Sequence, residues 1–114
     1  MKDEKPRISV NEMHGLLREG EIAEFNNRRA RGENPDLSGA DFRAIDLRGA
    51  KLEGLNLSNS YFRQADLRGL NLTACNLEGA SMVNANVSGT YFPKELSAEE
   101  IELSLKTGTR MRYR

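Results

Sequence analysis

A large apolar residue recurs at every fifth position between residues 35 and 94, and this period dominates the hydrophobic pattern of the chain. Twelve consecutive five-residue units keep one register without a break. A period of five fits neither the helical period of about 3.6 nor the strand period of about two. The apolar centres of the units are Leu37, Phe42, Leu47, Leu52, Leu57, Phe62, Leu67, Leu72, Leu77, Met82, Val87 and Phe92.

The positions around each centre repeat as well. A small residue usually stands two before the centre, Asp or Asn stands one before it, and Gly recurs two after it, where a tight corner needs positive φ. Three residues on a face and two at a corner satisfy this pattern. Four units then close a square coil of twenty residues, and the twelve units make three coils. Residues twenty apart should stack in interior columns, with coils about 4.8 Å apart.

Two units, Ala40-Asp41-Phe42-Arg43-Ala44 and Ala65-Asp66-Leu67-Arg68-Gly69, resemble the pentapeptide-repeat family, whose pattern is Ala, Asp or Asn, Leu or Phe, then two variable positions. The resemblance covers about half of the chain. It implies an all-β solenoid, a right-handed quadrilateral β-helix of three coils (twelve pentapeptide repeats), to which the flanking sequences add N-terminal and C-terminal α-helical caps. Bulky residues replace the usual Ala at three corners, where we expect bulges: Ile45, Leu55 and Leu70.

The flanking segments are helical in pattern. We expect a disordered lead over residues 1–8, an N-terminal helical cap over 9–34, the repeats over 35–94, a C-terminal helical cap over 95–108 and a basic tail over 109–114. Capping boxes begin at Ser9 and Ser97, and Gly108 is a stop signal. Caps are expected because the end of a stack exposes apolar interior and unpaired edges. If they cover both ends, end-to-end pairing is disfavoured; we expect a monomer and leave a dimer open.

Residues able to carry chemistry are few. The 114 residues include one histidine, His14, on an expected capping helix, and one cysteine, Cys75, in an inward small-residue slot. No zinc spacing, phosphate loop or dinucleotide fingerprint occurs, so we expect no enzyme, cofactor, metal or small-molecule substrate. With 17 basic and 17 acidic side chains, and no signal-peptide or membrane-length apolar stretch, we expect a cytoplasmic protein with no membrane partner.

Two surfaces are candidates for binding a partner. Stacking places Arg43 above Arg63 and Arg48 above Arg68, with Tyr61 beside them, and both residue types are enriched at binding hot spots. Alternatively, nearby aspartates neutralise the arginines and the face is simply solvated. The second candidate is the tail with Arg110, Arg112 and Tyr113. It could lie along the stack, hang free as a recognition segment, or fray.

The hypothesis for function is a non-enzymatic protein-protein interaction or scaffold module that presents rigid faces to a protein partner of unknown identity. The resemblance implies an alternative: some relatives mimic duplex DNA, bind a type II topoisomerase (gyrase) and protect it from quinolones. Such mimicry needs an acidic surface, whereas residues 35–94 carry six acidic and six basic side chains. Direct binding of nucleic acid is not expected, because neither net charge nor aromatic platforms favour it.

Overall fold

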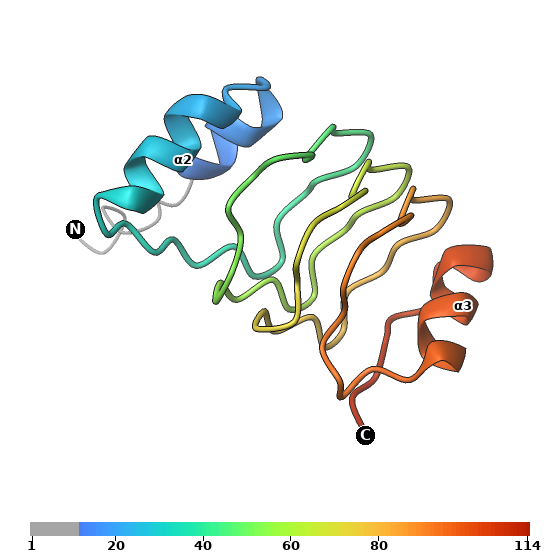
Figure 1. Cartoon of the computed structure of the whole chain (residues 1–114). Helices are drawn as coiled ribbons and strands as arrows, with labels where there is room; N and C mark the ends of the chain where they lie inside the picture. The colour runs from blue at the N-terminus through green and yellow to red at the C-terminus, as the bar shows by residue number, and fades with distance from the viewer. Residues whose placement is uncertain (1–11) are drawn as a thin grey trace, which may run out of the picture.

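The repeat region forms a stack of coils between helices in a computed structural model that describes residues 12–114. Residues 12–18 and α2 (Ile22–Ala30) are helical at one end of the stack, and α3 (Ala98–Thr107) lies at the other (Figure 1). The expected lead over residues 1–8 and the start of the capping box at Ser9 lie outside the described residues. As its sequence predicts, the Ser97 hydroxyl accepts a hydrogen bond from the Glu100 amide, and Gly108 ends α3 with φ of 78°.

Backbone hydrogen bonds join each coil to the next with a period of twenty residues. The Phe42 amide donates to the Tyr61 carbonyl (2.8 Å), and the Tyr61 amide donates back to the Ala40 carbonyl (2.9 Å). The same pair recurs one coil later between Phe62, Ser81 and Ser60. The coil length of twenty residues that was deduced from the five-residue period is therefore the repeat length of the stack.

The expectation of an all-β solenoid, a right-handed quadrilateral β-helix, is wrong for the described part of the chain. None of residues 12–114 lies in a strand, and the coils are joined by isolated parallel bridges such as Asp41 to Tyr61 and Asp46 to Asp66. The reason is the short distance between corners. In ten of the twelve units the residue before the centre, and no other, forms a bridge before the chain turns again, so no continuous ladder forms.

The centres of the units fill the interior in columns. Ten of them, from Leu37 to Met82, are at most 1% exposed, and the rings of Phe42 and Phe62 stack with centroids 5.2 Å apart and planes at 13°. The last two centres, Val87 and Phe92, are only partly buried. They belong to the third coil, which has no coil above it, so their outer sides depend on whatever covers that end.

The expected bulges at bulky corners do not occur. Ile45, Leu55 and Leu70 are between 4% and 8% exposed, and the stacking hydrogen bonds pass through them unbroken: the Ile45 and Leu70 carbonyls each accept one at 2.9 Å from the coil above. Small residues compensate, because the residue one coil above Ile45 is Ala65 and the residue one coil below Leu70 is Ala50.

Corner residues two after the centre adopt the left-handed conformation in ten of the twelve units, all but those of Ala74 and Lys94. Gly79 has φ of 80°, and a Cβ added there would lie 2.0 Å from Oδ1 of Asn59. Ala44 and Gln64 occupy the same kind of corner with φ of 61° and 60°. A non-glycine residue in this region costs about 1–2 kcal/mol. The stack therefore imposes the turn even where the sequence does not favour it.

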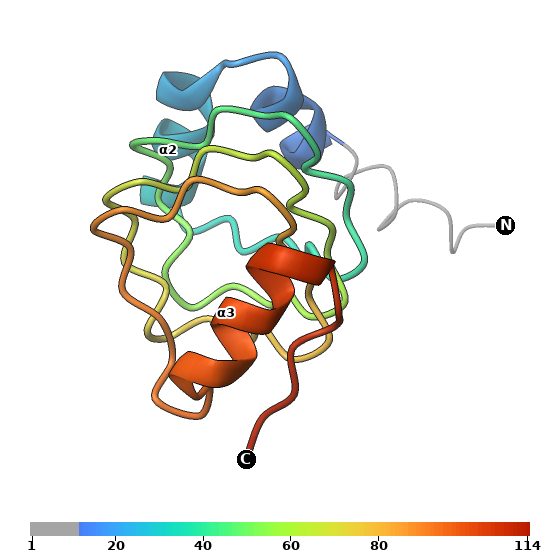
Figure 2. The ribbon, with the colours of Figure 1, turned by 90° about the vertical axis from the view of Figure 1, so that its right-hand side faces the viewer.

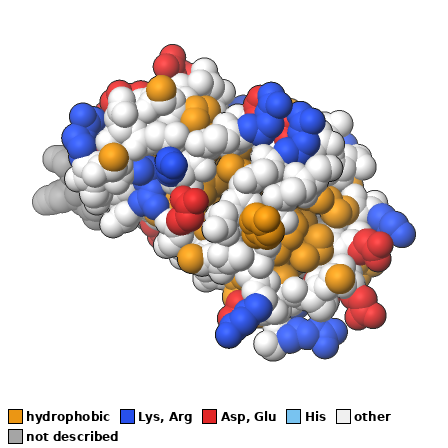
Figure 3. Space-filling model, in the orientation of Figure 1, with side chains coloured by type: hydrophobic (Ala, Val, Ile, Leu, Met, Phe, Trp, Pro, Cys, Tyr) orange, Lys and Arg blue, Asp and Glu red, His pale blue; other side chains and the backbone are white. Residues whose placement is uncertain are grey.

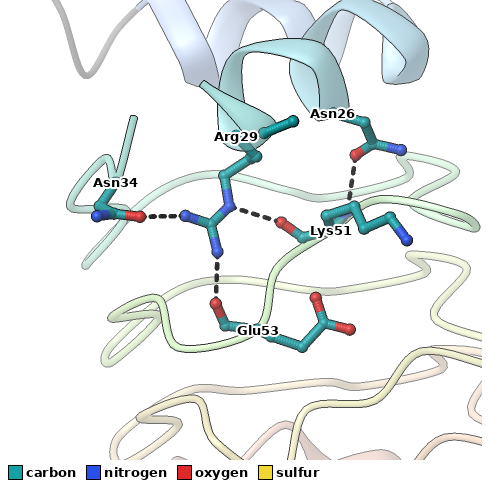
Figure 4. Close-up of a pocket in the computed structure, with 6 residues that line it drawn as sticks. Asn26, Arg29, Asn34, Lys51 and Glu53 are labelled. Carbon is teal, nitrogen blue, oxygen red and sulfur yellow. Dashed lines mark hydrogen bonds between the residues drawn. The ribbon is translucent and has the colours of Figure 1, made fainter. Parts of the chain in front are cut away.

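At the N-terminal end, side chains of α2 bind the backbone edge of the first coil (Figure 4). The Asn26 amide accepts from the Lys51 amide (2.8 Å) and donates to the Gly49 carbonyl (2.9 Å). Arg29 donates to the Lys51 carbonyl (2.9 Å) and the Glu53 carbonyl (2.5 Å). These side chains supply the donors and acceptors that a further coil would supply.

At the C-terminal end, α3 and the tail cover two faces of the third coil. The Met82 amide donates to the Ser104 hydroxyl (3.0 Å), and the Asn84 amide donates to the Leu105 carbonyl (3.0 Å). In Figure 2, α3 crosses one side of the end coil and leaves the other side uncovered. The expectation that the caps cover both ends is therefore met only in part at this end.

Replacing Leu67 with Ala should lower the free energy of unfolding by about 2–5 kcal/mol, because Leu67 is fully buried in the middle coil and its loss leaves a cavity. Thermal and denaturant unfolding would measure the change. Leu103→Ala is the matched control, since Leu103 is 47% exposed and should cost far less. Equal effects of the two substitutions would contradict the packing described above.

Candidate partner-binding surface

The Asp or Asn before each centre holds the local turn, a role that the sequence analysis did not assign. In seven of the eight units with Asp or Asn at this position, all except that of Asn86, the side-chain oxygen accepts a hydrogen bond from the backbone amide two residues later, as Asp41 does from Arg43 (3.0 Å). Short polar side chains commonly form this local turn. The residues that do so are Asp36, Asp41, Asp46, Asn56, Asp66, Asn71 and Asn76.

Three of the four arginines in the expected patch are paired with these aspartates. Arg43 Nε lies 2.9 Å from Asp41 Oδ1, and Arg68 Nη2 lies 2.6 Å from Asp66 Oδ2. Arg48 contacts Asp46 at 2.7 Å and also Asp66 in the next coil at 3.4 Å. The alternative of a neutralised face therefore fits Arg48 and Arg68, whose two carboxylates balance their charge. Figure 3 shows clusters in which basic and acidic side chains adjoin.

The ion pairs shift the acidity of the carboxyl groups. Hydrogen bonds from the Arg43 side chain hold the pKa of Asp41 well below its usual range. Hydrogen bonds from Arg68 lower the pKa of Asp66 from 3.8 to about 2, and Arg48 lowers the pKa of Asp46 in the same way. All three aspartates are consequently charged at neutral pH and occupied by their own arginines.

Arg63 differs from the other three because its unit has Tyr61, not Asp, before the centre. The side chain of Arg63 is exposed, and no carboxylate among residues 12–114 forms an ion pair with it. The Arg63 carbonyl accepts a hydrogen bond from the Ala44 amide (2.8 Å), which places Arg63 in the coil directly next to Arg43. The basic charge on this face is therefore only partly neutralised.

The tail lies along the stack rather than hanging free. Met111 is fully buried, its amide donates to the Ala80 carbonyl (2.8 Å), and its carbonyl accepts from the Gly79 amide (2.7 Å). The Tyr113 hydroxyl accepts from the Leu77 amide (2.9 Å) and donates to the Cys75 carbonyl (3.2 Å). Tyr113 is thus a structural residue of the end coil.

The docked tail brings the two candidate surfaces together at Tyr61. The Arg110 guanidinium lies 5.4 Å from the centre of the Tyr61 ring and donates to its hydroxyl (3.0 Å). Gly39, Asp41, Arg43 and Tyr61 line a shallow hollow of about 250 Å³ beside this contact. Arg48 and Arg68 belong to the adjacent face and are not part of this contact. Arg112 is exposed, and its backbone amide donates to the Glu100 carboxylate (2.8 Å).

The remaining groups with possible chemistry have structural contacts. His14 Nε2 lies 2.7 Å from the Asp41 carbonyl oxygen, and the ring packs edge-on against Phe42. Burial raises the pKa of the Cys75 thiol, which donates to the Leu52 carbonyl (3.1 Å). Within residues 12–114, no three His, Cys, Asp or Glu residues are grouped so as to hold a metal.

A hollow of about 350 Å³ lies between α2 and the first coil (Figure 4) and is lined mainly by polar side chains. Arg29 donates there to Asn34 and to the carbonyls of Glu33, Lys51 and Glu53. These donors join α2 to the coil. We therefore place the candidate site at Tyr61 rather than here.

Comparison with known proteins gives one match. A family model of pentapeptide repeats, in 8 copies, matches residues 33–64 and 56–93. No curated protein and no solved structure matches the chain significantly. None of the helices in the described part of the chain is both long and apolar enough to span a membrane.

Tyr113→Phe should destabilise the protein by about 1–3 kcal/mol, because the Leu77 amide and the Cys75 carbonyl both lose their partner. Denaturant unfolding measures the effect, and hydrogen exchange at the Leu77 amide should accelerate. Tyr91→Phe is the control, since Tyr91 is 65% exposed. Unchanged exchange at Leu77 would contradict the docked position of the tail.

Asp66→Asn should reduce the dependence of stability on acid pH. The lowered pKa means that the stabilising charge of Asp66 is fully present above about pH 4 and is lost as the pH falls through about 2. Asn keeps the turn-forming oxygen, as in other units, but removes the carboxylate. The free energy of unfolding of the variant should fall less between these pH values than that of the parent. An NMR titration placing the Asp66 pKa near 3.8 would refute the pairing.

Proposed function

Because the chain belongs to the pentapeptide-repeat family, we propose that it is a non-enzymatic interaction module that docks an acidic segment of a partner protein. The docking surface is formed by Arg43, Arg63, Tyr61 and Arg110, and is called the Tyr61 surface below. The observation that supports it is the contact between the Arg110 guanidinium and the Tyr61 ring, which joins the tail to the arginine face.

The charge around Tyr61 supports an acidic partner. Arg18, Arg43, Arg63 and Arg110 contribute four positive charges, while the carboxylate identified among them is Asp41, which lies 2.9 Å from Arg43 and 3.9 Å from Arg18. An arriving carboxylate can therefore bind Arg63 without displacing an existing ion pair of the described residues. Guanidinium groups bind carboxylates in a two-pronged geometry that adds specificity to the attraction.

Rigidity of the surface also supports this function. Arg110 is fixed by its bond to the Gly79 carbonyl (2.9 Å) as well as by Tyr61, and Tyr61 stands on a coil whose backbone is bonded on both sides. Side chains that are already positioned lose less conformational entropy when a partner binds. Aromatic and arginine side chains in this arrangement are typical of binding hot spots.

The alternative of a DNA mimic that binds a topoisomerase is less well supported. Asp41, Asp46 and Asp66, which such mimicry would present, are each paired with an arginine of the same unit. A surface whose acidic groups are neutralised in this way is a poor copy of the regular negative charge of duplex DNA.

An affinity pull-down from host lysate tests the proposal. The double variant Arg63→Glu/Arg110→Glu should lose a partner that the parent protein recovers, because the charge of the surface is reversed. The same complex should weaken as salt is raised. The matched control is Arg48→Gln/Arg68→Gln, which changes the same residue type on the neighbouring, neutralised face and should keep the partner.

Two outcomes would reject the proposal. Equal recovery of the partner by both double variants would place the binding site elsewhere on the molecule. If the parent protein and the Arg63→Glu/Arg110→Glu variant recover the same proteins, or none, the Tyr61 surface is ordinary solvated surface. Circular dichroism and thermal unfolding of each variant ensure that a lost partner reflects binding rather than misfolding.

A further inference from the structure

The third coil ends in a set of backbone groups to which no other group of residues 12–114 bonds. In the second coil the Leu67, Gly69 and Leu72 amides donate to carbonyls of the third coil at 2.8–3.0 Å. The Ala65 and Leu70 carbonyls accept from amides of the third coil at 2.9 Å. The groups one coil later have no hydrogen-bond partner within residues 12–114. They are the amides of Val87, Gly89 and Phe92 and the carbonyls of Ala85 and Thr90.

Apolar side chains lie beside this open edge. Val87 and Phe92 are interior residues that remain partly exposed, and Ile101 and Leu105 of α3 are partly buried against the same core. Figure 2 shows the side of the end coil that α3 does not cover. Figure 3 shows hydrophobic side chains reaching the surface between the coils and α3, with the charged side chains around them.

The edge carries no charge over a long stretch of sequence. No Asp, Glu, Lys, Arg or His occurs between Gly79 and Pro93, although 30% of the chain is charged. Proteins usually protect an exposed edge with charged side chains, a proline or a covering element, because an open edge pairs with other chains. In the third coil, α3 and the tail cover the first two faces. The other two faces, over residues 85–92, have no charged side chain and no proline, and no element of residues 12–114 covers them.

The chain's own tail shows which kind of segment covers such an edge. Residues around Met111 run along the neighbouring faces, exchange two backbone hydrogen bonds with Gly79 and Ala80, and bury the Met111 side chain completely. Residues 84–93 bond to the second coil through the backbone as well, at Asn86, Ser88 and Tyr91. In the tail the residue that makes these bonds and enters the core is the uncharged Met111, while Arg112 beside it is exposed.

We propose that the open edge from Ala85 to Phe92 binds an uncharged segment of a partner protein, which follows the edge around the corner at Gly89 and adds to the stack as a partial fourth coil. Its backbone bonds to the Val87 and Gly89 amides and the Ala85 carbonyl, and its large apolar side chain covers Val87 and Phe92. Addition of a strand to an edge is an established mode of peptide recognition. The site is separate from the Tyr61 surface and rests on different residues.

A synthetic peptide with the sequence of residues 84–93 is the probe, because that segment binds the equivalent groups of the second coil in the folded chain. A fluorescent peptide titrated with the full chain should show saturable binding. In ¹⁵N-labelled protein the Val87 and Gly89 amide signals should shift and become protected from hydrogen exchange. Absence of saturable binding, or shifts located elsewhere, would overturn the proposal.

Val87→Pro is the informative variant. It removes one open donor but keeps the Val87 carbonyl, which accepts from Thr90 (3.0 Å), and both stacking bonds of Asn86. Loss of one hydrogen bond should raise the Kd by about tenfold or more. Arg63→Glu, on the Tyr61 surface, should leave peptide binding unchanged, so failure of this proposal and of the proposed function can be told apart.

Two further measurements use the parent protein, so they test the proposal even if the Val87→Pro variant does not fold. A peptide N-methylated at the residue corresponding to Asn86 cannot donate to the Ala85 carbonyl and should bind the parent protein at least about tenfold more weakly. Equal binding of the two peptides would overturn the proposal. Sedimentation of the free protein as a dimer with protected Val87 and Gly89 amides would overturn it in favour of a second copy of the chain.

Discussion

Hydrogen bonds between successive coils are the interaction on which the rest of this structure depends. A coil of twenty residues has its corners fixed by local turns, but most of its remaining backbone donors and acceptors bond to the coil above or to the coil below. Buried peptide groups without a partner are costly. The backbone groups in the middle of the stack are therefore mostly bonded by neighbouring coils, whereas those at both ends need other partners. The segments outside the repeats are arranged so that they supply many of these partners.

The ends are completed largely by side chains that imitate a backbone. Asn26 offers a carbonyl and an amide at the spacing of a peptide group, and Arg29 reaches two carbonyls of the same edge. At the other end the hydroxyls of Ser104 and Tyr113 take the place of carbonyl oxygens. The helices contribute few backbone groups, because most of these are bonded internally; the Leu105 carbonyl in the last turn of α3, which accepts from the Asn84 amide, is one that reaches the coil. The helices act as supports that carry these side chains to the edge.

Much of the stack was predictable because one period links every residue to its neighbours. The five-residue spacing correctly predicted the burial of ten centres and the stacking of Phe42 on Phe62, whereas Val87 and Phe92 in the last coil are only partly buried. It did not predict the secondary structure, since apolar spacing shows where side chains point but not whether bridges join into strands. The pairing of Arg43, Arg48 and Arg68 was within reach of the sequence: each follows an Asp by two residues, whereas Arg63 follows Tyr61. The position of Tyr113 was not, because it depends on where α3 ends and how the tail returns.

The twenty-residue repeat of the hydrogen bonds also gives the molecule an adjustable length. Each coil meets its neighbours through the same backbone groups, and the terminal segments contact mainly the first or the last coil. Insertion or removal of whole coils would therefore change the distance between the two ends in steps of about 4.8 Å while leaving each end's contacts intact. Shorter insertions would break the register of every coil beyond them. Variation in the length of such a chain is thus confined to multiples of one coil, and the separation of surfaces at its two ends becomes a property that gene duplication can set.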